Sequence, residues 1–231
     1  MDMGNCIHPP YLFRKGAHFM HLMIRPITPF CPPSISENPL LLINGAVLLI
    51  MAMLAAVFIS LYASGAYKGN RKKAVLFFVG ITALAALMLL SFFGCAATTL
   101  KGIIFCLLLV FSSYEDIKTR ECENYVHLMI VIAAFIGTDM SALPGMLLSA
   151  LLVGGIMLIT TAVTKSKLGG ADIKLSAACA FLLGAVQGLI GLVIGLTLAV
   201  IINSVKNRKK KQTGFPLIPY LAVGFMTAYF I

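Results

Sequence analysis

The chain has 231 residues, of which 60% are hydrophobic and 11% are charged, and its formal net charge is +10. With a mean hydropathy of +0.98, it is not an ordinary soluble globular protein, in which about a quarter of the residues are charged. The composition predicts an all-α, polytopic helical membrane protein.

Residues 1–39 contain no long apolar run and several prolines. Their histidines and cysteines match no standard zinc-binding spacing. We therefore expect residues 1–39 to form a poorly ordered tail rather than a metal site.

Eight apolar runs follow, and we expect about eight transmembrane helices. They cover residues 40–63, 74–95, 97–114, 125–138, 143–164, 173–186, 188–205 and 216–231. Several are shorter than the ~20 residues that a straight span needs, so these helices must extend into flanking residues or lie where the membrane is thinner and accessible to water. Residues 40–96 would form two additional helices joined by a short basic cytoplasmic loop, and residues 97–231 a membrane core of about six helices.

The basic residues lie mainly in alternate loops, within residues 68–73, 118–120, 165–167 and 206–211. By the positive-inside rule these loops face the cytoplasm, which predicts a multi-pass protein of the cell's inner (plasma) membrane. The partner of this charge is then the lipid bilayer and not a nucleic acid. No oligomeric state follows from the sequence.

Two aspartates stand at the ends of apolar runs in a chain with only eight acidic residues. Asp116 begins the string DIKTR, and Asp172 ends the string GGAD and is followed by IKL. A carboxylate at a bilayer boundary is costly, which indicates a function. Both aspartates fall on the predicted cytoplasmic side, where folding could bring them together.

Other catalytic patterns are missing from the sequence. It has no Cys-x-x-Cys pair, no glycine-rich phosphate loop, no Ser-x-x-Lys and no His-Glu-x-x-His. We therefore expect no zinc or other metal, no cofactor and no structural disulfide. Two close carboxylates can hydrolyse a peptide bond without these groups, because together they retain one proton and supply both a base and an acid.

Three strings, in this order and spacing, resemble the type IV prepilin peptidases, which are membrane aspartyl proteases of the Gly-x-Gly-Asp type. The first contains Asp116, Lys118, Arg120 and Asn124; the second contains Gly169, Gly170, Asp172, Lys174 and Leu175; the third contains Pro216, Pro219 and Gly224. The resemblance covers residues 97–231.

The chain departs from the family pattern at two places. Cys122 and Glu123 replace the usual Ile-Pro, and Ala171 replaces the glycine that usually precedes the second aspartate. The methyl group of Ala171 is tolerable if its backbone is not at positive φ.

The resemblance implies an endopeptidase with Asp116 and Asp172 as the catalytic pair. Its expected substrates are prepilins or pseudopilins, which carry a basic leader before an apolar helix. The chain is similar to short members that lack the cysteine-motif domain, so methyltransferase activity is not implied. We also predict that Glu115, Glu121 and Glu123 attract the basic leader.

Two other functions remain open. A proton-coupled transporter also uses membrane carboxylates, but it predicts acids in mid-span and an internal repeat, and the sequence shows neither. A catalytically silent assembly protein of the same fold is the second alternative. Asp116 beside Arg120, or Asp172 beside Lys174, could also be an interfacial ion pair. Asp139 has no motif around it, and we expect it to have no catalytic role.

Overall fold

The computed structural model describes residues 39–67, 70–164, 169–206 and 216–231. In these ranges the chain forms eight α-helices and one short 3-10 helix, with no β-strand. The predicted all-α class is therefore confirmed. The predicted N-terminal tail lies almost entirely outside the described residues.

The helices follow one another in an almost uninterrupted series. They are α2 (Pro39–Ala66), α3 (Arg71–Phe93), α4 (Ala97–Thr119), α5 (Asn124–Ala134), η1 (Met140–Ala142), α6 (Leu143–Thr164), α7 (Gly170–Leu183), α8 (Ala185–Lys206) and α9 (Ile218–Tyr229). Each of the eight predicted apolar runs coincides with one of the α-helices.

Five of the described helices, α2, α3, α4, α6 and α8, are long and apolar enough to cross a membrane. The chain is thus a multi-pass membrane protein. In contrast, α7 has 14 residues, α9 has 12 and α5 has 11. At about 1.5 Å per residue, none of these three reaches across a hydrocarbon core of about 30 Å. The eight predicted helical segments are therefore present, and α5, α7 and α9 are the short ones among them, as the sequence led us to expect for several runs.

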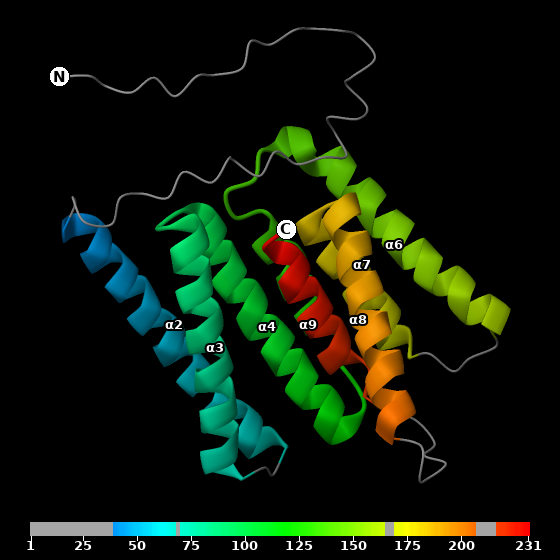
Figure 1. The fold of residues 1–231 in the computed structure, drawn as a ribbon, viewed down its shortest axis with the longest axis horizontal. Helices are drawn as coiled ribbons and strands as arrows, with labels where there is room; N and C mark the ends of the chain where they lie inside the picture. Colours follow the sequence, from blue (N-terminus) through cyan, green and yellow to red (C-terminus); the bar gives the residue numbers. More distant parts are fainter. Residues whose placement is uncertain (1–38, 68–69, 165–168, 207–215) are drawn as a thin grey trace, which may run out of the picture.

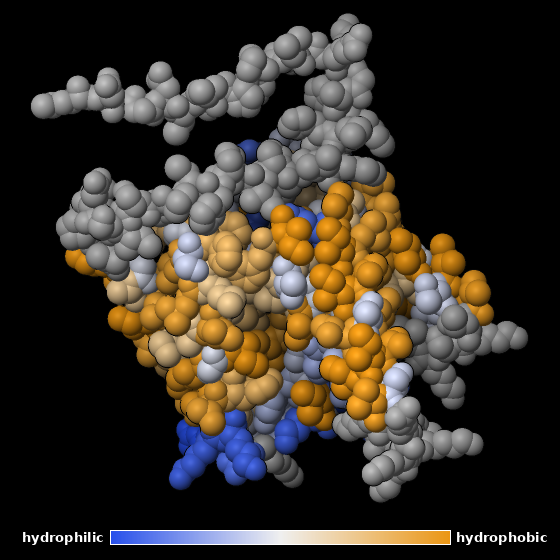
Figure 2. Space-filling view, in the orientation of Figure 1, coloured by the Kyte–Doolittle hydropathy of each residue, from blue (hydrophilic) through white to orange (hydrophobic). Residues whose placement is uncertain are grey.

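Helix α4 is the centre of the bundle. It is buried over most of its length and packs against α2, α3, α5 and α9. The α2–α3 hairpin lies on one side of α4, and the group formed by α6, α7 and α8 lies on the other (Figure 1). Apolar side chains cover most of the face shown in Figure 2, as expected where a protein meets lipid.

Helices α8 and α9 approach each other closely at a glycine contact. A Cβ atom added to Gly224 would lie 2.3 Å from the carbonyl oxygen of Gly191. No side chain fits there, so the two backbones touch. This packing fixes α9, which also contacts α4.

The functional end of the bundle is the one where α2 and α4 end and α7 and α9 begin. Arg120 terminates α4 in a left-handed conformation (φ 58°), and its N–H donates to the Asp116 carbonyl oxygen at 3.0 Å. Gly169 precedes α7, and Leu217 precedes α9. These helix ends bring four distant segments together.

Candidate active site

Asp116 lies in the last turn of α4 with only 6% of its surface exposed. Its Oδ2 atom accepts a hydrogen bond of 3.0 Å from the backbone N–H of Ile218, the first residue of α9. Ile218 lies between Pro216 and Pro219 of the third string. Sequence reasoning did not identify this donor, although the two prolines marked the segment that supplies it.

Asp172 lies in the first turn of α7, and its carboxylate folds back over Gly169. A Cβ atom added to Gly169 would lie 3.2 Å from Oδ2 of Asp172. The backbone N–H of Gly169 also donates to this carboxylate, as an acidic side chain in the first turn of a helix often allows. Because glycine has no Cβ atom, the Asp172 carboxylate can lie against residue 169.

At this end of the bundle Asp116 lies close enough to Asp172 for its charge to act on the Asp172 carboxyl group. Burial, followed by the charge of Asp116, raises the pKa of Asp172 from 3.8 to about 6, against the lowering effect of the Gly169 N–H. Two interacting carboxyl groups in a partly buried setting retain one proton between them. The pair can therefore offer one acid and one base.

Two contacts bridge α5 and α7 beside the pair. The Lys174 ammonium donates to Oδ1 of Asn124 at 3.0 Å. One turn further into α5, the buried His127 places its two ring nitrogens 3.1 Å from the carbonyl oxygens of Glu123 and Ala171. Sequence reasoning missed His127, and its only signal was a histidine within an apolar run.

The other predicted supporting residues lie around this site. Lys118 is exposed, with its ammonium 5.7 Å from the centroid of the Tyr114 ring. Arg120 is exposed, and its charge acts on Asp116. Gly170 has no atom within 4 Å of an added Cβ. Ala171 is helical, so its methyl group is accommodated without a positive φ.

The three glutamates that we predicted to attract a leader differ in exposure. Glu121 and Glu123 are exposed, whereas Glu115 is 1% exposed and accepts a hydrogen bond from Tyr67. Of the three, only Glu121 and Glu123 present their charge to the surface. Glu115 is part of the interior.

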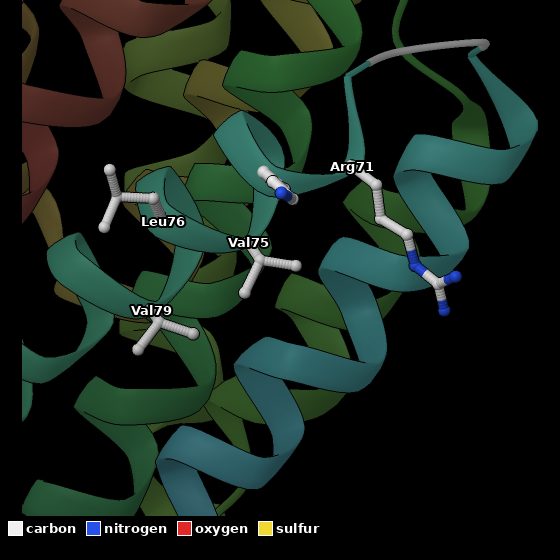
Figure 3. A pocket seen from close by; sticks show the side chains of 5 residues that line it. Arg71, Val75, Leu76 and Val79 are labelled. Atoms are coloured by element: carbon white, nitrogen blue, oxygen red, sulfur yellow. The ribbon is translucent and has the colours of Figure 1, made fainter.

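Two hollows lie away from the carboxylates. One, of about 470 Å³, lies on the outer side of α3 and is lined by Arg71, Lys72, Val75, Leu76 and Val79 (Figure 3). Apart from its two cations the lining is aliphatic, so it holds no group that could activate water. The hollow is therefore not the candidate site.

The second hollow, of about 390 Å³, is lined by Asp139, Lys101, Thr138 and Gln187 among others. The exposed Asp139 lies between α5 and α6, at the end of the bundle opposite to Asp116 and Asp172. This position agrees with the absence of a motif around it.

Within the described ranges, no group of three or more His, Cys, Asp or Glu side chains could hold a metal ion. The cysteines of these ranges, Cys95, Cys106, Cys122 and Cys179, form no disulfide with one another.

Comparison with known proteins agrees with this geometry. Residues 103–204 match the type IV leader peptidase family. No curated protein and no solved structure matches the chain. The matched segment includes both Asp116 and Asp172, and it excludes the α2–α3 hairpin and the Ile218 donor. The resemblance seen in the sequence is confirmed over this segment, in which the chain is similar to the type IV leader peptidase family.

Proposed function

We propose that this protein is a membrane aspartyl endopeptidase that removes the basic leader of prepilins or pseudopilins at the cytoplasmic face of the inner membrane. The observation that carries the proposal is the meeting of Asp116 and Asp172 at one end of the bundle. The charge of Asp116 contributes, after burial, to the raised pKa of Asp172. Both lie within the segment that matches the leader peptidases.

We assign the acid role to Asp172 because its raised pKa favours retention of the shared proton. The carboxylate of Asp116, held by the Ile218 N–H, takes a proton from water. The resulting hydroxide attacks the scissile carbonyl carbon. Asp172 gives its proton to the leaving amine as the C–N bond breaks, which leaves a new amino terminus and a carboxyl group.

The position of the site supports the substrate class. The carboxylates lie at the end of a lipid-facing bundle, where a helix inserted in the membrane would present the residues just before its apolar part. The exposed Glu121 and Glu123 follow Asp116 and offer negative charge to a basic leader. The alternate basic loops favour the cytoplasm for this end.

The test uses the purified full-length protein in detergent with a prepilin, with leader removal followed by gel electrophoresis and mass spectrometry. We expect Asp116→Asn and Asp172→Asn each to lower cleavage by at least about a hundredfold, because each removes one of the two proton-transfer groups. The double variant should be little worse than either single variant, because the pair acts as a unit.

Asp139→Asn is the matched control, since it makes the same change at the opposite end of the bundle and should cleave normally. Substantial activity in Asp116→Asn or Asp172→Asn would refute the two-carboxylate mechanism. Mass spectrometry of the product also checks that the new amino terminus stays unmethylated, as expected for a chain without Cys-x-x-Cys pairs.

A further inference from the structure

A buried carboxylate that the proposed reaction does not use lies directly before Asp116. Glu115 is 1% exposed, and a buried charged group is costly unless hydrogen bonds compensate it. Its two oxygens have different partners, and these partners come from different parts of the chain.

Oε1 of Glu115 accepts a hydrogen bond from the hydroxyl of Tyr67, the residue that follows α2. Oε2 accepts from the backbone N–H of Glu123, the residue before α5, at 3.4 Å. Glu115 therefore joins the α2–α3 hairpin on one side to the α4–α5 loop on the other. Both hydrogen bonds are made by Glu115, which lies beside Asp116 at the end of α4.

Aromatic packing holds the Tyr67 side chain in place. Its ring meets that of Tyr114 edge-on at 6.3 Å between centroids, and Tyr114 meets Phe78 of α3 at 5.5 Å. Burial, followed by the hydrogen bond to Glu115, raises the pKa of Tyr67 above its ordinary range. The hydroxyl thus keeps its proton and remains a donor.

We propose that Glu115 is a positioning residue for the active site. Through the hydrogen bond between Tyr67 and Glu115, the α2–α3 hairpin is then required for full peptidase activity. Clamping the Glu115 side chain between Tyr67 and Glu123 sets the rotation of the last turn of α4 and therefore the direction of the Asp116 carboxylate. The family match begins at residue 103, so Tyr67 comes from outside it. The inference rests on the proposed function.

The competing role for Glu115 is attraction of the basic leader by negative charge. Glu115→Gln separates the two roles. Its amide oxygen can accept the Glu123 N–H and its amide N–H₂ can donate to the Tyr67 oxygen, so both contacts persist without the charge. Glu115→Leu removes both contacts, and Tyr67→Phe removes one of them with little change of shape.

The first measurement is the kinetics of prepilin cleavage. We expect Glu115→Leu and Tyr67→Phe to lower kcat by about tenfold and about threefold with little change in KM, because small misplacements of a catalytic group are costly. Glu115→Gln should stay within about twofold of the wild type. Tyr62→Phe is the matched control: Tyr62 lies on α2, five residues before Tyr67, but is 64% exposed, and the variant should be unchanged.

The second measurement does not depend on a substrate. Cys122 precedes Glu123 in the α4–α5 loop, and its thiol lies 3.1 Å from the Ser112 hydroxyl. Burial raises the pKa of this thiol to about 11, which makes it slow to react. The charge of Glu115 also raises the pKa of this thiol, so Glu115→Gln and Glu115→Leu share the effect of losing that charge. If the clamp holds the loop, alkylation of Cys122, followed by peptide mass spectrometry, should be several-fold faster in Tyr67→Phe than in the wild type and several-fold faster in Glu115→Leu than in Glu115→Gln.

The outcomes separate this inference from the proposed function. A wild-type protein that cleaves no prepilin would overturn the proposed function, while the alkylation rates would still support or overturn the clamp. Wild-type kinetics and alkylation in Tyr67→Phe would overturn the clamp. A Glu115→Gln variant as impaired as Glu115→Leu, with raised KM, would establish charge attraction in its place.

Discussion

The glycine pair before Asp172 offers a sharp test, because the structure assigns its two members different roles. Gly169 has φ −64° and ψ 137°, a conformation that alanine adopts without strain. The effect of Gly169→Ala must therefore come from the added methyl group. That methyl would lie 3.2 Å from Oδ2 of Asp172 and 3.9 Å from its Cγ.

The magnitude follows from this contact. To relieve it, the Asp172 carboxylate must move by a few tenths of an ångström. A misplacement of about 1 Å can cost roughly a hundredfold in rate, so a few tenths should lower kcat about four- to tenfold. Alanine is also a poorer N-cap than glycine, which should cost up to about 1 kcal/mol of unfolding free energy.

Gly170→Ala is the matched control. An added Cβ at Gly170 meets nothing within 4 Å, and Gly170 is the first residue of α7. Alanine there should leave kcat unchanged and stabilise the helix by at most about 1 kcal/mol. Prepilin cleavage and thermal unfolding of both variants in detergent measure these effects. Equal kinetics for the two variants would contradict the role assigned to Gly169.

Three further predictions concern stability and substrate binding. Folding raises the pKa of Asp172 from 3.8 to about 6, so its protonated form favours the folded state and this contribution is lost as pH rises through about 6. The unfolding free energy of Asp172→Asn relative to the wild type should thus increase between about pH 4 and about pH 6, by up to about 3 kcal/mol at about 1.36 kcal/mol per pKa unit. Thermal unfolding of both proteins across this pH range measures the difference, and a decrease in it would disprove the prediction. Reversing the charge of Glu121 and Glu123 should raise KM more than it lowers kcat, and the effect should fade at high salt. If the kinetics of the variant do not depend on salt, Glu121 and Glu123 have no role in attracting the substrate. Gly224→Ala should lower the unfolding temperature markedly, because its methyl would meet the Gly191 carbonyl oxygen at 2.3 Å; near-normal stability would show that α8 and α9 separate easily.

Local patterns in the sequence were sufficient for the class of the protein and for its two principal acids. Long apolar runs must be helices in lipid, because their backbone groups can bond only within the segment. The rarity of acidic residues made Asp116 and Asp172 conspicuous, and their surrounding strings resembled the family that residues 103–204 match. Helix ends were less predictable, because α5, α7 and α9 are shorter than a full span.

Only the tertiary structure decided which groups surround the two aspartates. The Ile218 N–H reaches Asp116 across 102 positions of sequence, and Tyr67 reaches Glu115 from a hairpin outside the family match. Glu115 was predicted to attract a leader together with Glu121 and Glu123, yet packing of α2 and α3 against α4 buries it. Hydropathy and residue spacing indicate which secondary structure and environment each segment prefers by itself. The contacts that build the site depend instead on how helix ends meet, which side-chain packing and close glycine contacts determine.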